Sequence, residues 1–375
     1  MSDSILDFLE PLNLSEISND TGYKEGQMGT VIKIYEDEFP DIDEAGIILI
    51  GCNEQRGGAL LHQSMAANTI RNEFYSLYYW QQDVTIADIG NIKTGKTVND
   101  TYAALKLVLR ELTSSGKLVV ILGGSHDLTL SQYHAFAEEK ILIDAVGIDA
   151  LIDINIEAPF RAENFLMEML TAEPNYMKHY NHIAFQSYFV HPRMLETMDK
   201  LRFDCYRVGA VKEHIEDMEP VIRNCHLLSF DISALAHSSA PANHITPNGL
   251  NGEEACTLMQ YAGMSPNMRT IGIYGYRPER DVENLTAKQI SHMLWYLIEG
   301  NSRGRREAKI NEKDSFNEYH TVFAELETTF IQSKKTGRWW MQLPDKQFIA
   351  CSYKDYMIAS SNEIPERWLR SQERP

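Results

Sequence analysis

Three short segments of this chain carry histidine or aspartate at positions from which they could bind a metal ion. His126 follows an apolar run that ends in a glycine pair. Asp149 and Asp153 follow a second apolar run, and Asp231 ends a third. Imidazole nitrogens and carboxylate oxygens are common ligands of divalent metals in proteins. The residue types therefore indicate a metal site, provided that the fold brings the three segments together.

The elements that precede these residues are apolar and rich in β-branched side chains, which is typical of strands covered on both faces. Such runs alternate with segments of helical spacing, so the sequence predicts a three-layer α/β/α sandwich with a mainly parallel sheet of about eight strands. Right-handed crossovers would place all carboxyl ends at one edge, where ligands collect in such sheets. The predicted strands are 45–51, 84–90, 117–122, 141–148, 183–189, 203–208, 226–231 and 270–275, and the predicted helices include 60–79, 99–115, 128–139, 252–262 and 286–299.

Composition changes along the chain indicate three parts. Residues 1–44 are polar and acidic and are expected to form an irregular N-terminal arm, and residues 45–300 form the α/β/α domain. Residues 301–375 begin with a basic segment, interpreted as a hinge, and form a small annex that packs on the main domain. In an extended segment, Trp339 and Trp340 would point to opposite faces, so one of them could dock on that domain. A partner-binding surface is the alternative role for this annex.

The overall charge excludes some classes of function. The 375 residues carry a formal net charge of −18, which argues against nucleic-acid binding because that depends on lysine and arginine. Five dispersed cysteines are expected to be reduced thiols of a cytoplasmic protein. The acidic start does not resemble a signal peptide, and no apolar run approaches the ~20 residues of a membrane span. A homo-oligomer remains open.

The three segments resemble the motifs of the ureohydrolase (arginase, agmatinase, formimidoylglutamase) superfamily, and most closely those of the formimidoylglutamase-like members. The matching segments are Gly123-Gly-Ser-His126, Asp149-Ala-Leu-Ile-Asp153 and Ser229-Phe-Asp-Ile-Ser233, and their order agrees over about residues 45–300. The resemblance implies a hydrolase that cleaves the carbon–nitrogen bond of a small linear amidine. In that family, two Mn²⁺ ions share a hydroxide that metal coordination makes available near neutral pH.

The resemblance also implies that the metal site is incomplete. The family uses six ligands, and this chain supplies four of them: His126, Asp149, Asp153 and Asp231. Leu151 stands where the family has a histidine, and Ser233 stands where it has an aspartate. Both losses affect the second ion, so at most one Mn²⁺ is expected, and two-metal catalysis is expected to be weakened or lost.

Other positions follow or depart from the family pattern. By resemblance, Asp149 and Asp231 would be catalytic, and Asn155 matches a substrate-binding position. The family's acid near the last strand corresponds to Gly275, and the loop after the second motif lacks the proton-shuttling histidine. Two loop histidines, His237 and His244, are candidates to replace a lost ligand.

Structural roles remain as alternatives for the same residues. His126 could cap the helix predicted at 128–139, and Asp149 and Asp153 could be helix caps or loop acids. The segment Arg56-Gly-Gly58 is interpreted as a tight turn and packing element. At the level of function, three hypotheses remain: an active amidine hydrolase, an arginase-fold pseudoenzyme that binds a ligand or partner, and a structural subunit. Leu151 discriminates most between them, because leucine cannot coordinate a metal.

Overall fold

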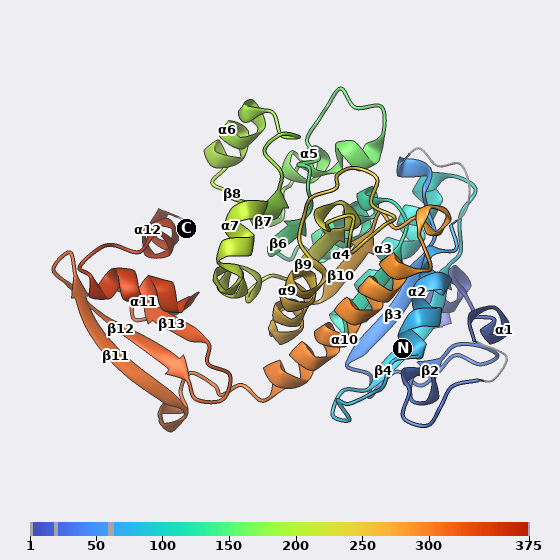
Figure 1. Cartoon of the computed structure of the whole chain (residues 1–375), viewed down its shortest axis with the longest axis horizontal. Coiled ribbons are helices and arrows are strands. Elements are labelled where there is room, and N and C mark those ends of the chain that lie inside the picture. Colours follow the sequence, from blue (N-terminus) through green and yellow to red (C-terminus); the bar gives the residue numbers. More distant parts are fainter. Residues whose placement is uncertain (1–2, 19–21, 59–63, 374–375) are drawn as a thin grey trace.

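The fold is built around one large sheet, and the computed structural model describes residues 3–18, 22–58 and 64–373 (Figure 1). Eight neighbouring strands form the parallel core of this sheet, so the predicted α/β sandwich with a mainly parallel sheet is confirmed. In spatial order they are β4 (Ile86–Ile92), β3 (Ile47–Cys52), β5 (Leu118–Gly123), β10 (Thr270–Tyr274), β9 (Leu227–Asp231), β6 (Ile143–Ile148), β7 (Met177–Phe185) and β8 (Asp204–Arg207).

The order of the central strands positions the predicted site. The strands β5, β10, β9 and β6 are consecutive neighbours in the sheet, although β6 follows β5 directly in the chain. The strand ends that precede His126, Asp149 and Asp231 therefore lie within one four-strand segment. Because these strands are parallel, their carboxyl ends share one edge of the sheet.

Helices cover both faces of the sheet, as expected for a parallel sheet with crossover connections. Side chains alternate along each strand: Val120 and Leu122 of β5 face one helical layer, while Val119 and Ile121 face the other. The first layer contains α1 (Leu14–Ile17), α2 (Ala66–Tyr75), α7 (Val208–Glu213), α8 (Glu219–Ile222), α9 (Gly252–Met264) and α10 (Leu285–Arg305). The second contains α3 (Val98–Ser114), α4 (Thr129–Glu138), α5 (Phe165–Leu170) and α6 (Pro192–Lys200).

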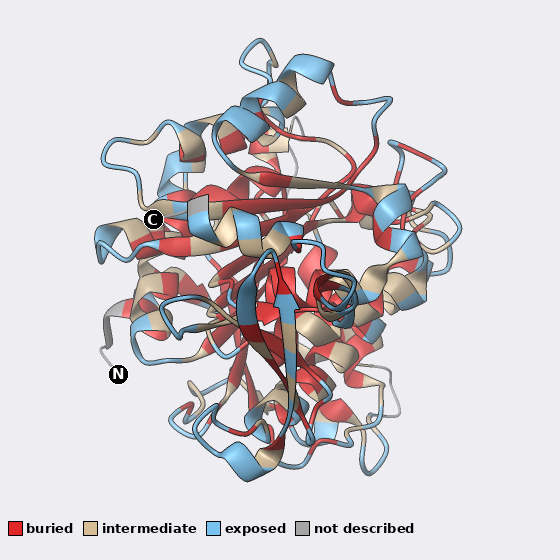
Figure 2. Ribbon diagram, turned by 90° about the vertical axis from the view of Figure 1, so that its left-hand side faces the viewer, coloured by how far each residue is buried: buried red, intermediate tan, exposed pale blue. Residues whose placement is uncertain are grey.

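Figure 2 shows the strands of the large sheet as mainly buried, with exposed residues concentrated on the outer surfaces of the helices and in the loops. Among the residues that the structure describes, no helix combines the length and apolar character needed to cross a membrane.

The N-terminal arm is more ordered than predicted. It contributes β1 (Leu9–Glu10), which pairs antiparallel with β4, and β2 (Lys33–Ile34), which pairs parallel with β4. Without them, β4 would be an edge strand with unpaired backbone groups. Leu9, in β1, is buried against β4. The arm therefore covers the edge of the sheet and is not irregular throughout.

Two predicted boundaries were wrong. The strand predicted at 183–189 begins at Met177 and ends at Phe185, because the residues before Ile183 show no apolar run, although 180–182 are buried in the sheet. The basic hinge predicted after residue 300 continues α10 as far as Arg305. For the helix predicted at 60–79, α2 accounts for residues 66–75, while 59–63 lie outside the described residues.

The last part of the chain forms a second, antiparallel sheet. Its strands, in spatial order, are β11 (Phe316–Phe323), β12 (Leu326–Ser333), β13 (Trp339–Gln342) and β14 (Phe348–Cys351). The helices α11 (Tyr353–Ser360) and α12 (Glu366–Glu373) follow. Trp339 packs with Tyr319 and Tyr356 on one face, whereas Trp340 lies on the other face with Phe316.

Charged side chains connect this small sheet to α8 and to the segment that follows α10. The Arg223 guanidinium lies 4.4 Å from the centre of the Trp340 ring and donates to the carboxylate of Glu219. Arg338 donates through Nε to Glu307 Oε2 at 2.9 Å and lies 5.6 Å from the same ring. All four charged residues are nearly buried, and each cation has a carboxylate partner, as buried charges require.

Candidate metal centre

The loop after β5 carries His126 into the centre of the sheet edge. Backbone atoms pack closely around this loop, so that a Cβ on Gly124 would lie 1.7 Å from the carbonyl oxygen of Glu54. Ser229, on the neighbouring strand β9, lies with its Oγ 2.8 Å from His126 Nε2, and Thr129 Oγ1 lies 2.6 Å from the same Oγ. These contacts occupy one ring nitrogen and direct the other, Nδ1, towards the carboxylates.

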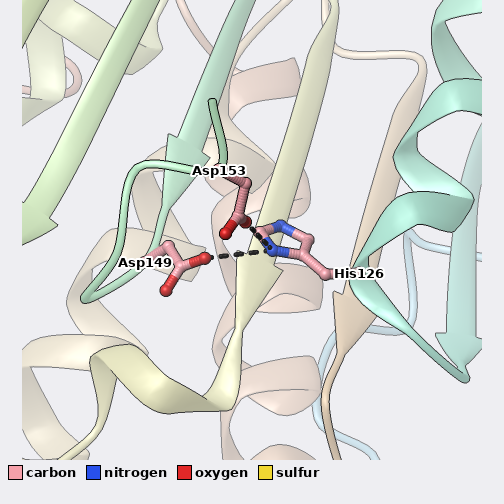
Figure 3. Close-up of side chains that lie close together, drawn as sticks. All are labelled: His126, Asp149 and Asp153. Carbon is pink, nitrogen blue, oxygen red and sulfur yellow. Dashed lines mark ion pairs between the residues drawn. The ribbon is translucent and has the colours of Figure 1, made fainter. Parts of the chain in front are cut away.

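His126 Nδ1 is the point at which the predicted residues meet. It lies 3.0 Å from Asp149 Oδ2, 3.0 Å from Asp153 Oδ2 and 3.9 Å from Asp231 Oδ2. Figure 3 shows the first two carboxylates converging on the ring from the loop after β6. The four residues predicted as ligands are therefore brought together, and Asp127, the next acid in the chain, points elsewhere and accepts from Tyr102 OH.

The donor set suits one divalent cation. One ligand atom from each of His126, Asp149 and Asp153 lies within 4.8 Å of the others, and all three residues are buried. A single Nδ1–H cannot serve two carboxylates equally, so the cluster has more acceptors than donors. A cation would balance the buried negative charge, and oxygen and imidazole ligands are compatible with Mn²⁺.

The electrostatics of the cluster lead to the same conclusion. Burial, followed by the charge of Asp149, raises the pKa of Asp153 to about 8 and that of Asp231 to about 6. Burial would also raise the pKa of Asp149, but hydrogen bonding to His126 outweighs it and lowers this pKa. Burial alone would lower the pKa of His126, yet its carboxylate neighbours raise it well above the ordinary value. At pH 7 and without a cation, protons on His126 and Asp153 therefore offset only part of the negative charge of the cluster, and metal binding would displace them.

The second carboxylate oxygen of Asp149 is already engaged. Its Oδ1 accepts hydrogen bonds from Ser233 Oγ and from the Leu151 backbone N–H, the latter at 3.0 Å. Ser233 also donates its backbone N–H to Asp231 Oδ1 at 2.8 Å. The Ser233 hydroxyl and the backbone N–H groups of Leu151 and Ser233 thus hold the carboxylates in place, and they leave Asp149 Oδ2 facing His126.

The cluster lines one part of a cavity of about 180 Å³. His244 and Leu151 line this cavity, whereas His237 and Asn155 are not among its lining residues. His237 Nδ1 contacts the carbonyl oxygen of Asn243 at 2.9 Å, and Asn155 Oδ1 accepts from the backbone of Glu157 at 3.2 Å. The structure therefore places the predicted substrate-binding residue Asn155 in a loop turn outside the cavity.

Gly275 closes the cavity beside Asp231. Its φ is +79°, a left-handed conformation that favours glycine. A Cβ at this position would lie 2.5 Å from Asp231 Oδ2, so no larger side chain fits while Asp231 keeps its place. The absence of a side chain at residue 275 is thus coupled to the position of the Asp231 carboxylate.

Sequence reasoning missed two residues that support the cluster. Ser229 orients His126, although it was noted only as part of a motif. His182 is buried in β7, its Nε2 lies 3.2 Å from the carbonyl oxygen of Asp149, and its Nδ1 lies 3.1 Å from Tyr180 OH. Burial lowers the pKa of His182 to about 4, so it stays neutral at pH 7. His182 was not identified from the sequence because the start of β7 lacks the apolar pattern of a buried strand.

The chain is similar to known proteins of one family. The arginase family model matches residues 45–299. The formimidoylglutamase of Bacillus subtilis (strain 168) is 26% identical over 197 residues, which cover 48% of this chain and 60% of that protein's length. The formimidoylglutamase of Macrococcus caseolyticus (strain JCSC5402) is 22% identical over 251 residues, covering 62% of this chain and 77% of that protein.

The fold is also similar to solved structures. The crystal structure of Trypanosoma cruzi formiminoglutamase with Mn²⁺ superposes with a TM-score of 0.66 and 14% identity, over 74% of this chain and 99% of that one. The family model covers more than half of the present chain and includes all four predicted ligands. This chain therefore belongs to the arginase family.

Proposed function

We propose that this protein is a formimidoylglutamase-like member of its family that holds one Mn²⁺ and binds a small linear amidine, with weakened or lost hydrolysis. The observation that supports this most is the double engagement of Asp149 Oδ1. In a two-ion site this oxygen would face the second ion, but here Ser233 and Leu151 donate hydrogen bonds to it. A second cation would have to break the hydrogen bonds from the Ser233 hydroxyl and the Leu151 backbone N–H. It would gain no ligand from the Leu151 side chain, and from Ser233 only a hydroxyl, which is a poor ligand unless it is deprotonated.

The residues present fit a single ion of the first-site type. Asp149 Oδ2, Asp153 Oδ2 and His126 Nδ1 would hold it, with Asp231 beside them. When bound, such an ion would acidify a water molecule and polarise the group to be attacked. Ser229 would keep the imidazole in its orientation, and the buried position of the carboxylates would exclude bulk water from one side.

Weakened catalysis follows from what is missing around that ion. Removing the second cation removes electrostatic stabilisation worth several kcal/mol, and each 1.36 kcal/mol corresponds to about tenfold in rate. Gly275 supplies no acid, and no histidine follows Asp153 in its loop. A non-catalytic role as a ligand-binding pseudoenzyme is the second candidate, favoured by these same substitutions.

Two measurements test the proposal. Metal content of purified, Mn²⁺-equilibrated protein should approach one equivalent, and hydrolysis of formiminoglutamate should be slow or undetectable. One equivalent with slow turnover supports a weakened hydrolase, whereas one equivalent with ligand binding but no turnover supports the pseudoenzyme. Two equivalents with rapid turnover would show that the proposal is wrong, as would the absence of any bound metal.

A further inference from the structure

The outer edge of the small sheet is an unprotected strand. β11 pairs with β12 over eight residues without a break in register, and among the described residues nothing pairs with its other side. Figure 1 shows β11 at the outer margin of the small sheet, away from the large one, whereas the opposite edge strand, β14, lies near α8. Proteins usually protect such edges with lysine, proline or bulges. The β11 sequence Phe-Asn-Glu-Tyr-His-Thr-Val-Phe contains none of these.

The turn determines which backbone groups point outward. Ala324 and Glu325 form a two-residue turn with φ values of 48° and 63°, the conformation of a type I′ hairpin. In such a hairpin the flanking residues, Phe323 and Leu326, exchange backbone hydrogen bonds, and bonded pairs then alternate along the strands. The residues of β11 whose N–H and C=O groups point away from β12 are therefore Phe316, Glu318, His320 and Val322.

We propose that this edge pairs with the same edge of a second copy of the chain. Two β11 strands would run antiparallel about a twofold axis at Tyr319, so that the two small sheets become continuous. In this register every outward-pointing residue has a partner: Glu318 faces His320 of the second copy, and Phe316 faces Val322 of the second copy. All the outward backbone donors and acceptors of both strands are then satisfied.

The side chains favour this register over its neighbours. Opposed Glu318 and His320 can form a cross-strand hydrogen bond through His320 Nε2, since the other ring nitrogen, Nδ1, contacts Thr329 Oγ1 at 3.2 Å. A shift of two residues in either direction would place Glu318 against itself or His320 against itself. Either shift would also leave one outward-pointing residue at the end of each β11 strand without a partner. The register with the largest overlap is thus the one with complementary side chains.

This self-complementarity argues for a second copy as the occupant, because a symmetric interface requires residues i and j to face j and i. Pairing of one strand buries less than the ~1,200–2,000 Å² of a standard stable interface. The dimer should therefore be weak and depend on concentration. Val322, with 54% of its surface exposed, is the apolar side chain that pairing would cover.

Sedimentation velocity of the full chain over low to high micromolar concentrations tests the proposal. A monomer–dimer equilibrium is expected. His320→Pro should abolish the dimer, because it removes an outward N–H, and proline is tolerated on an edge strand where that N–H faces solvent. His320→Glu should weaken the dimer by opposing two carboxylates, and the matched double variant Glu318→His with His320→Glu should restore it.

Each variant should retain the wild-type melting temperature and metal uptake, which separates loss of pairing from misfolding. A wild-type chain that stays monomeric at every concentration would overturn the proposal. A dimer that survives His320→Pro, or a double swap that does not recover pairing, would place the interface elsewhere. Binding of an extended peptide to a monomeric chain would identify a different occupant and also contradict the second-copy assignment.

Discussion

Replacing Asp153 by asparagine should stabilise the metal-free protein. Its buried carboxyl group has a pKa of about 8, so at pH 7 the folded state holds a proton that the unfolded state has released. The unfolded pKa of aspartate is about 3.9, and three pH units correspond to an upper bound of about 4 kcal/mol. Asparagine has nearly the same shape and never ionises, so it avoids this cost of folding.

The sign of the pH dependence follows from the raised pKa. A carboxyl group whose pKa is higher in the folded state stabilises the fold below its unfolded pKa, and this contribution is lost as pH rises through the folded pKa. Metal-free wild-type protein should therefore lose stability between about pH 4 and pH 8 relative to Asp153→Asn. Mn²⁺ should reverse the ranking, because it binds only the folded wild-type site and stabilises it by mass action.

Thermal unfolding in EDTA and in millimolar Mn²⁺, at pH 5 and pH 8, separates these effects. The wild-type melting temperature should rise with Mn²⁺, whereas that of the variant should be higher in EDTA at pH 8 and nearly unaffected by the metal. If Asp153→Asn is less stable than wild type in EDTA at pH 8, the buried carboxylate is not electrostatically strained. Equal Mn²⁺ stabilisation of both proteins would exclude Asp153 as a ligand.

Three further outcomes are expected. Leu151→His with Ser233→Asp should raise manganese stoichiometry from one towards two, measured by elemental analysis, and a ratio that stays at one would refute the ligand assignment. Gly275→Glu should lower the melting temperature and metal affinity, because its Cβ would lie 2.5 Å from Asp231 Oδ2 and its φ of +79° costs about 1–3 kcal/mol; unchanged unfolding curves would contradict this. His182→Asn should reduce acid sensitivity. The unfolded histidine gains a proton below about pH 6.5, whereas the folded one is protonated only below about pH 4, so the free energy of unfolding of the wild type falls by on the order of 3 kcal/mol over that window. Parallel denaturant midpoints of wild type and His182→Asn from pH 7 to pH 4 would count against it.

Much of the architecture could be predicted from local patterns. The central strands β3, β5 and β10 are nearly continuous apolar runs, so their positions follow from burial alone. β8 and the first half of β7 carry no such run: β8 is a short polar segment that is only partly buried, and Asn181 and His182 of β7 are buried by their neighbours in the sheet and not by their own character. The candidate ligands were also predictable, since each follows such a strand at its carboxyl end.

The order of the strands was decided by tertiary structure. Nothing in the sequence places β10 and β9 between β5 and β6, yet this order brings His126 to 3.0 Å from Asp149. The same holds for the N-terminal arm, whose short polar strands form because the edge of β4 offers them hydrogen-bond partners. Short segments of this kind carry no periodic signal of their own.

The sequence alone determined which side chains could bind a metal and, through the family resemblance, at which positions ligands are expected to be missing. Only the tertiary structure decided what the substituted residues do. Ser233 lies in the 3₁₀ turn after β9 and donates its side-chain hydroxyl to Asp149 Oδ1 across 84 residues of sequence, whereas the backbone N–H of Leu151 donates to the same oxygen from within the same loop. Hydrogen bonds between distant segments depend on backbone positions to within a few tenths of an ångström, and only the packed sheet sets those positions.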